Sequence, residues 1–352
     1  MISRDKTYKF AIGNRLIGGD SPILIQTMSN IKTSKVEENI KLCHDLETLG
    51  CDMIRFSTFD EEDCLALKEI KMHTSLPVIA DIHFNYKYAL LALDAGVDKI
   101  RLNPGNITKN NLDEVVAKLK EKDAALRIGV NSGSLGKYAL TSENVKEQFL
   151  TAVEEMLSYF ESNDFHKMVL AAKNTSPDLT RELYFALAEK YQYPLHIGLT
   201  ESGFGIQGTI KSCTALIPIL SAGIGNTIRI SLTDDPREEV LACKTLLKSM
   251  GLKKNVPTLI SCPTCGRTQV DVYNIARYVE DKLKYVNKDI TVAVMGCPVN
   301  GPGEAKHATF GIAGGINSFI VFKKGVAIGS YPEKEAMEIL FNLIDKENEN
   351  EI

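Results

Sequence analysis

Eight short apolar runs alternate with helical patterns over the first 245 residues, and this alternation limits the possible folds more than any other feature. The segments between the runs carry apolar residues at helical spacing, as in Lys35–Leu49 and Asn144–Phe160. Eight strand–helix units in about 240 residues is the size of a (β/α)8 TIM barrel. A doubly wound open sheet is the alternative, but the strand number and even spacing favour closure. The expected strands are Ile23–Met28, Met53–Ser57, Val78–His83, Lys99–Asn103, Leu126–Asn131, Lys167–Ala172, Pro194–Leu199 and Thr227–Leu232.

An internal repeat supports the barrel. Leu49–Ser57 matches Ala95–Asn103 nearly position for position, with a glycine, an aspartate and then a strand that reads Ile-Arg-apolar-polar. The eighth expected strand repeats this ending as Ile228–Ser231. Glycine suits the residue just after a helix, where the backbone turns left-handed. The repeat therefore predicts a helix end followed by a strand in each copy.

The repeated arginines predict an anion-binding site. Side chains alternate between the two faces of a strand, so each arginine shares a face with the polar residue that ends its strand. Active sites of such barrels lie at the carboxyl ends of the strands. We expect Arg55, Arg101 and Arg229 to converge inside the barrel mouth, where a polyanion of diphosphate size would join them. The alternative is three structural pairs between arginines and carboxylates.

Polar residues at the ends of the other strands extend this predicted site. A lone strand histidine is more often a satisfied core residue, so the prediction depends on the set as a whole. Glu201 follows the seventh expected strand at the rim, and we expect it to deliver a proton. Further contacts to the substrate are expected from Asp81, His83, Asn103, Asn131, Lys173, His196 and Ser231.

Three of the eight cysteines lie among glycines and prolines in the last hundred residues. Cys262 and Cys265 form a C-x-x-C pair, Cys297 follows 32 residues after Cys265, and Glu304 comes seven residues later. Structural zinc sites usually have a second pair of ligands, which is missing here. Three thiolates fit an iron–sulfur cluster better, with Glu304 as a more replaceable fourth ligand. Spacing alone leaves zinc open, and with it a zinc-containing barrel enzyme acting on another phosphorylated or pterin-like substrate.

The remaining cysteines lie in apolar patterns and are expected to be buried thiols. They are Cys43, Cys51, Cys64, Cys213 and Cys243.

A linker at Lys253–Pro257 divides the chain into a barrel domain, residues 1–250, and a second domain, residues 256–352. We expect the second domain to be a small α+β domain with the cysteine loops at one end of its sheet. Its expected elements are the strand Thr258–Ser261, a helix with an apolar face from Val272 to Val286, the strand Ile290–Met295, a glycine-rich loop Gly301–Gly315, a hairpin of Phe319–Phe322 and Val326–Gly329, and a helix after Pro332.

Composition narrows the class of protein. The chain is 44% hydrophobic, which suffices for a large core, and its net charge of −4 gives no support for a nucleic-acid partner. Met1–Phe10 has no apolar signal region, and no apolar run is long enough to span a membrane. We therefore expect a cytoplasmic protein with reduced thiols.

These motifs resemble one family, the iron–sulfur 4-hydroxy-3-methylbut-2-en-1-yl diphosphate synthases of the methylerythritol phosphate route to isoprenoids. The matching segments occur in order along the whole chain. They are Gly18–Ile23, Ala80–Phe84, Ile100–Asn106, Arg127–Asn131, Gly198–Glu201, Ser261–Arg267 and Met295–Glu304.

The resemblance implies a barrel followed by a domain similar to one of sulfite and nitrite reductases. It implies a [4Fe-4S] cluster held by Cys262, Cys265, Cys297 and Glu304, with Glu304 also taking part in catalysis. The implied substrate is 2-C-methyl-D-erythritol 2,4-cyclodiphosphate, with flavodoxin or ferredoxin as electron donor, and the implied assembly is a homodimer. The chain lacks the long insert of plant-type members, so it resembles the short bacterial form. Departures at Gln26–Ile31 and Ser132 affect local loops only.

Overall fold

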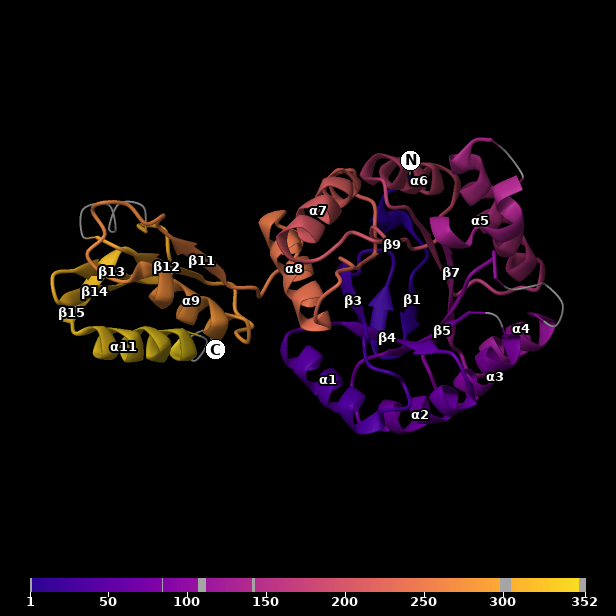
Figure 1. Ribbon diagram of the computed structural model, residues 1–352, viewed down its shortest axis with the longest axis horizontal. Helices are drawn as coiled ribbons and strands as arrows, with labels where there is room; N and C mark the ends of the chain where they lie inside the picture. The colour runs from indigo at the N-terminus through magenta and orange to yellow at the C-terminus, as the bar shows by residue number, and fades with distance from the viewer. Residues whose placement is uncertain (1, 84, 107–111, 141–142, 298–304, 348–352) are drawn as a thin grey trace. The chain divides into compact units, whose positions relative to one another are not determined.

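A computed structural model describes residues 2–83, 85–106, 112–140, 143–297 and 305–347. The chain divides into two compact units, Met1–Leu252 and Lys253–Ile352 (Figure 1). Each unit has its own hydrophobic core.

The first unit is a ring of eight parallel strands surrounded by helices (Figure 1), which confirms the predicted TIM barrel. The strands are paired in the order β8-β7-β6-β5-β4-β3-β10-β9, and a parallel bridge between Leu170 and Leu195 links the two ends. The strands are β3 (Leu24–Met28), β4 (Met53–Thr58), β5 (Val78–Ile82), β6 (Lys99–Leu102), β7 (Ala125–Asn131), β8 (Met168–Lys173), β9 (His196–Ile197) and β10 (Thr227–Ile228). The last two are shorter than predicted.

The outer helices alternate with these strands, and their buried faces form the larger core of the unit. They are α1 (Val36–Thr48), α2 (Glu61–Met72), α3 (Tyr86–Asp94), α4 (Leu112–Glu121), α5 (Val145–Ser162), α6 (Pro177–Lys190), α7 (Gly205–Ser221) and α8 (Pro236–Ser249). Short 3-10 turns occur at Arg4–Lys6, Ser132–Ser134 and Gly136–Leu140.

The internal repeat is a repeated helix-to-strand connection. Gly50 and Gly96 have φ angles of 81° and 88°, as predicted for the residue after a helix. The aspartates serve one function in both copies: Asp52 Oδ2 accepts a 2.8 Å hydrogen bond from Ile25 N, and Asp98 Oδ2 accepts one of 2.7 Å from Val78 N. Each aspartate thereby ties its own strand to the start of the preceding one.

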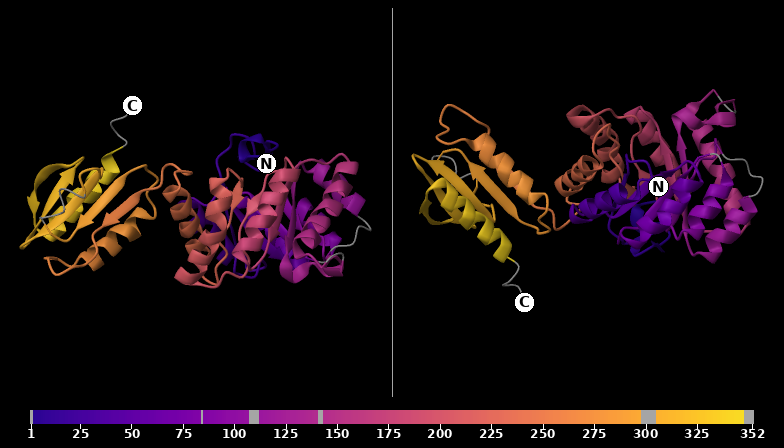
Figure 2. Two further views of the ribbon diagram at one scale, coloured as in Figure 1. Left: turned by 90° about the horizontal axis from the view of Figure 1, so that it is seen from above. Right: turned by 60° about the horizontal axis from the view of Figure 1, so that its bottom comes forward.

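An N-terminal hairpin that the sequence patterns did not predict closes one end of the barrel. Its strands are β1 (Phe10–Ile12) and β2 (Arg15–Ile17), seen in indigo in Figure 2. Ile12 and Ile17 are buried and form a small cluster with five inward-facing strand residues: Leu24, Met53, Ile79, Ala125 and Val169. This apolar plug separates the polar barrel interior from solvent at the amino ends of the strands.

The second unit is a five-stranded sheet with two helices on one face (Figure 1). The strands lie in chain order. The first three pair in parallel, the fourth pairs antiparallel with the third, and the fifth pairs antiparallel with the fourth. The elements are β11 (Thr258–Ser261), α9 (Val272–Leu283), β12 (Thr291–Met295), β13 (Phe310–Gly315), β14 (Ser318–Lys323), β15 (Val326–Tyr331) and α11 (Glu333–Lys346).

The prediction of a glycine-rich loop was wrong for its last six residues, which form the central strand β13. Its glycines serve close packing instead of turns. A side chain at Gly311 would collide with the ring of Phe322, and one at Gly314 would collide with Val270. Phe310 and Ile312, two residues apart on the strand, share one face and pack in the core.

No helix within the described ranges is long and apolar enough to cross a membrane.

Candidate functional site

Six cationic side chains, on the barrel strands or directly after them, form what we call the cation cluster: Arg55, Lys99, Arg101, Arg127, Lys173 and Arg229. Arg55 lies close enough to Arg101 and Arg229 for their charges to act on it. Burial, together with these two guanidiniums, lowers the pKa of Arg55 to about 10 despite the nearby Asp81. The structure thus brings together the three arginines singled out in the sequence.

Asp81 on β5 is the carboxylate shared by two of these arginines. Its Oδ1 lies 3.1 Å from Arg101 Nη1, and its Oδ2 lies 3.7 Å from Arg55 Nε. Burial disfavours ionisation of Asp81, but Arg101 and Arg55 outweigh it and hold the pKa of this carboxyl well below its usual range. Asp81 is therefore a fixed negative charge and a poor proton donor at neutral pH.

Glu239 is the second carboxylate, and the sequence patterns did not identify it. It comes from the first turns of α8 and accepts two hydrogen bonds of 2.8 Å from Arg229 Nε and Nη2. Thr27 Oγ1 donates to the same carboxylate at 2.6 Å. A charged residue on the buried face of α8, next to Val240 and Cys243, was the available signal.

The alternative of three separate structural pairs is met only in part, because within the described residues two carboxylates form salt bridges with only three of the six cations. Lys99, Arg127 and Lys173 form no salt bridge with any residue of the described ranges. Arg127 is 2% exposed, and neither its Nε nor its Nη1 has a hydrogen-bond partner among those residues. A buried guanidinium left in this state is costly unless an anion joins it.

Lys99 and Arg127 were also missed as site residues, although the alternation rule could have found them. Lys99 precedes Arg101 by two residues, and Arg127 precedes Asn131 by four, so each shares the inner face with a residue that was predicted.

Burial and mutual repulsion change the protonation of the cluster. Burial first, then Arg127, Arg229 and Arg55, lowers the pKa of Lys173 well below its usual range. Burial first, then Lys173, Arg127, Lys99 and Arg55, lowers the pKa of His196, which is fully buried on β9. Its Nδ1 lies 2.7 Å from Thr227 Oγ1, while its Nε2 has no partner in the described part of the chain. His196 is therefore a neutral imidazole with one open nitrogen.

The other predicted residues lie around the strand ends. His83 Nε2 is 3.9 Å from Asp81 Oδ2, and Asn103 Oδ1 accepts a 3.1 Å hydrogen bond from Gly105 N. Glu201 is exposed and has a φ of 54°, an uncommon conformation outside glycine. Asn131 ends β7, and Ser231 follows β10 in a half-buried position.

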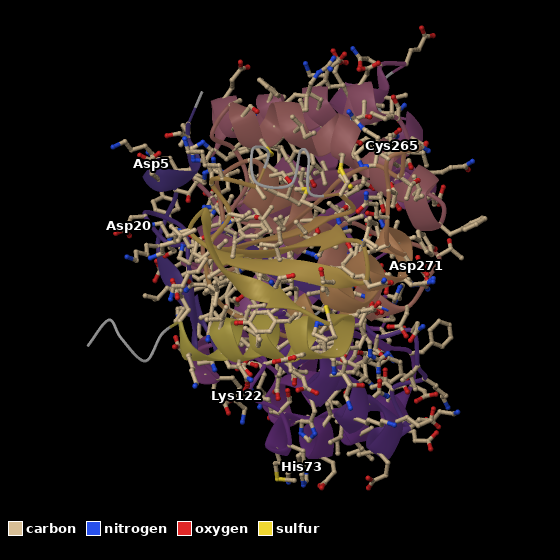
Figure 3. The ribbon with its side chains drawn as sticks, turned by 90° about the vertical axis from the view of Figure 1, so that its left-hand side faces the viewer. Asp5, Asp20, His73, Lys122, Cys265 and Asp271 are labelled. Atoms are coloured by element: carbon tan, nitrogen blue, oxygen red, sulfur yellow. The ribbon has the colours of Figure 1, made fainter. Side chains whose placement is uncertain are left out.

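The three cysteines lie at the carboxyl ends of two adjacent parallel strands in the second unit. Cys262 follows β11, and Cys297 follows β12 and is buried. Cys265 is exposed, on the loop that leads to Asp271 at the start of α9 (Figure 3). Glu304 lies outside the described residues. Among the described residues, no three His, Cys, Asp or Glu side chains are already arranged as a metal site.

The surroundings of the cysteines fit a thiolate-bound group. Gly296 N donates a 3.2 Å hydrogen bond to Cys262 Sγ. N–H groups of the Arg267 backbone and side chain lower the pKa of the Cys265 thiol. A Cβ at Gly296 would lie 2.5 Å from Val272 Cγ2 and 3.4 Å from Cys262 Sγ, so only glycine lets the backbone pass there. Such N–H donors and close backbone loops suit iron–sulfur ligation.

Comparison with protein families gives two matches that cover most of the chain. Residues 7–244 match the GcpE TIM-barrel domain, and residues 258–346 match the GcpE protein C-terminal domain. Two curated relatives are named 4-hydroxy-3-methylbut-2-en-1-yl diphosphate synthase (flavodoxin). The protein from Ruminiclostridium cellulolyticum is 45% identical, covering 98% of this chain and 99% of the relative. The protein from Malacoplasma penetrans is 43% identical, covering 97% and 95%.

Two solved structures illustrate the similarity of the barrel fold. A truncated 3-deoxy-D-arabino-heptulosonate 7-phosphate synthase from Thermotoga maritima has a TM-score of 0.50 at 15% identity, covering 72% of this chain and 97% of that one. Plasmodium falciparum HPPK-DHPS has a TM-score of 0.52 at 12% identity, covering 70% and 51%.

Proposed function

This chain belongs to the GcpE family, and on that basis we propose that it reductively opens 2-C-methyl-D-erythritol 2,4-cyclodiphosphate to 4-hydroxy-3-methylbut-2-en-1-yl diphosphate. It is an oxidoreductase, and flavodoxin, which the relatives' names contain, is its proposed electron donor. The observation that carries the substrate class is the excess of buried cations over carboxylates in the barrel.

The barrel holds the diphosphate. Arg55, Arg101 and Arg127 offer guanidinium N–H groups suited to bidentate phosphate contacts, with Lys173 and Arg229 beside them. Gly198 leaves room for the Lys173 side chain to make this contact, because a Cβ at Gly198 would lie 2.5 Å from Lys173 Nζ. The polar strand ends, Asn103, Asn131 and Ser231, contact the hydroxyl and phosphate oxygens at the mouth.

Cys262, Cys265, Cys297 and Glu304 hold a [4Fe-4S] cluster, which supplies electrons one at a time when bound. The N–H groups of Arg267 stabilise the thiolate form of Cys265, and Gly296 N donates a hydrogen bond to Cys262 Sγ. Glu304 is the ligand that exchanges most easily, because a carboxylate binds soft iron–sulfur centres less firmly than thiolate.

The chain's own side chains handle the protons. Two electrons enter the substrate, the C2–oxygen bond of the ring breaks, and the C3 oxygen leaves as water. Glu201 at the rim gives the proton to that oxygen. His83 and His196 orient the substrate, since His83 is near Asp81 and His196 keeps one nitrogen open toward the interior.

The same proposal includes a homodimer, a cytoplasmic location and ferredoxin as the alternative electron donor. The cysteines, all eight of them free in the structure, are consistent with this location.

The deciding experiment is anaerobic purification, analysis of iron and acid-labile sulfide, and an assay on the cyclic diphosphate with a chemical reductant. We expect about four iron and four sulfide per chain, as in a [4Fe-4S] protein, and formation of the linear diphosphate. A cluster-loaded protein that yields no product would refute the proposal. A colourless, sulfide-free protein containing zinc would favour the zinc-enzyme alternative.

A further inference from the structure

Lys99 is a buried cation that lies beneath the proposed substrate site. It is fully buried on β6, two residues before Arg101, so it lies one layer deeper on the same inner face. Its Nζ lies 3.4 Å from Gln26 Oε1 and 3.4 Å from Met53 Sδ. Met53 belongs to the apolar plug closed by the N-terminal hairpin. Lys99 therefore lies between that plug and the other members of the cation cluster.

The charged groups that act on Lys99 come from several strands and are mostly positive. Arg127 on β7 and Arg55 on β4 repel it, and Lys99 in turn acts on His196 of β9. Asp98 precedes it but is already engaged by Lys71 Nζ and the Val78 N–H, each through Oδ2. The neutral Gln26 and Met53 supply its direct contacts. Within the described part of the chain, Lys99 thus has cationic neighbours and no carboxylate contact.

Charging all six members of the cation cluster at once is costly, because only two carboxylates of the described residues form salt bridges with them. Arginine does not lose its proton in proteins, whereas a lysine amine does. The amines are therefore the groups that relieve the repulsion. An anionic ligand at the mouth reverses the balance and favours the ammonium form.

We propose that Lys99 is a positioning residue that is neutral in the substrate-free barrel and takes up a proton when the diphosphate binds above it. The inference depends on the proposed diphosphate site. The proton comes from solvent, because each phosphate of a cyclic diester has already lost its single acidic proton at neutral pH. Lys99 then adds a positive charge beneath Arg101 and Arg127 without touching the substrate.

The shift in the pKa of the Lys99 amine supports a neutral Lys99 in the substrate-free barrel. Burial, then Arg127 and Arg55, lowers the pKa of Lys99 well below its usual range. Lys173 has a lowered pKa for related reasons, so it also takes up protons, and the test has to separate the two lysines.

The test is calorimetric titration of the full-length, cluster-loaded protein with 2-C-methyl-D-erythritol 2,4-cyclodiphosphate, without reductant so that no turnover occurs. Measurements at one pH near 8 in buffers of different ionisation enthalpy give the number of protons taken up per binding event. The matched variants are Lys99→Met, which keeps the length and apolar stem, and Lys68→Met, which removes an exposed lysine of α2.

We expect net proton uptake by the wild type and by Lys68→Met, and about one proton fewer in Lys99→Met if the linkage is complete. The affinity of the wild type should also fall faster with rising pH than that of Lys99→Met, by up to tenfold per pH unit. Binding with equal proton uptake in Lys99→Met and wild type would overturn this inference while leaving the substrate site intact. Absence of binding by the wild type would overturn both.

Stability provides a second readout that does not need the ligand. The unfolded chain protonates Lys99 below about pH 10.4 whereas the folded chain does not, so the wild type gains stability relative to Lys99→Met as pH rises toward that value. The Tm of Lys99→Met minus the Tm of the wild type should therefore fall as pH rises. A value of this difference that stays constant or rises with pH would mean a charged, paired Lys99 and would contradict the inference. Lys99→Gln, which retains a polar contact for Gln26, serves if the methionine variant does not fold.

Discussion

Arg127 combines full burial with a permanent charge and two nitrogens that lack partners within the described residues. Burial, then Arg55 and Arg101, lowers its pKa, yet a guanidinium keeps its proton, so the cost appears as lost stability. Such a residue lowers the stability of the ligand-free protein and favours the binding of an anion. A ligand-binding arginine therefore lowers stability and raises affinity for the anion, whereas a structural arginine raises stability.

We predict that Arg127→Met stabilises the ligand-free protein by about 1–3 kcal/mol, since it removes an uncompensated buried charge. The same change should weaken binding of the cyclic diphosphate by about 10- to 100-fold, the loss of charge-assisted hydrogen bonds. Thermal unfolding and calorimetric titration measure the two effects. Arg181→Met, at a partly exposed pair with Asp178 on α6, is the control and should change neither by much. A less stable Arg127→Met with unchanged affinity would show a structural role.

Single-residue patterns predicted the direction of the inner side chains but not their partners. Alternation along β4 and β6 placed Arg55 and Arg101 on the inner face. The partner of Arg229, however, is Glu239 on a helix, and helix-to-strand contacts depend on how α8 packs against the barrel. The spacing of apolar residues along the sequence does not show how α8 packs against the strands.

The N-terminal hairpin is the element that completes the barrel. Ile17 on β2 is fully buried in the apolar plug, while its neighbour Leu16 is 53% exposed on the opposite face. The plug lies directly beneath Lys99, through the shared contact with Met53. The hairpin thereby keeps water from the amino end of the interior.

We predict that Ile17→Ala lowers the free energy of unfolding by about 2–4 kcal/mol, because it leaves a cavity among residues from several strands. Leu16→Ala is the matched control on the same strand and should change stability by less than about 0.5 kcal/mol. Urea denaturation monitored by circular dichroism gives both values. Equal effects of the two substitutions would contradict the plug.

The sequence patterns did not predict two elements, the hairpin of β1 and β2 and the strand β13, and the physical reason is the same for both. The three-residue strands β1 and β2 are too short for their alternation to be recognised. Strand β13 contains three glycines, which resemble a loop until the rings and methyl groups that fill their places are known. Both elements depend on contacts with distant residues, such as Phe322 for Gly311.

The whole molecule consists of two units with separate cores, and the proposed ligands are divided between them. A ligand stabilises the unit that binds it by about 2.7 kcal/mol at a hundredfold excess over its Kd. The cyclic diphosphate and the iron–sulfur cluster should therefore act on different parts of the unfolding transition.

We predict two calorimetric transitions in the full-length protein. The cyclic diphosphate should raise the Tm of the barrel transition, which Ile17→Ala identifies by lowering it. Removal of the cluster with a chelator should lower the Tm of the other transition, because metal-binding free energy is also folding free energy. A diphosphate-induced shift confined to the transition that the chelator lowers would contradict the assignment of the substrate to the barrel.

By itself, the sequence determined the barrel, the inner face that carries Arg55 and Arg101, and the three cysteines of the second unit. These depend on local properties: strand alternation, helical period and motif spacing. Only the tertiary structure decided the charge balance. It paired Arg229 with Glu239, left Arg127 without a partner among the described residues and placed Lys99 beside Gln26, 73 residues earlier. The reason is that electrostatic energy depends on distances across the barrel, and these exist only once the ring of strands has formed.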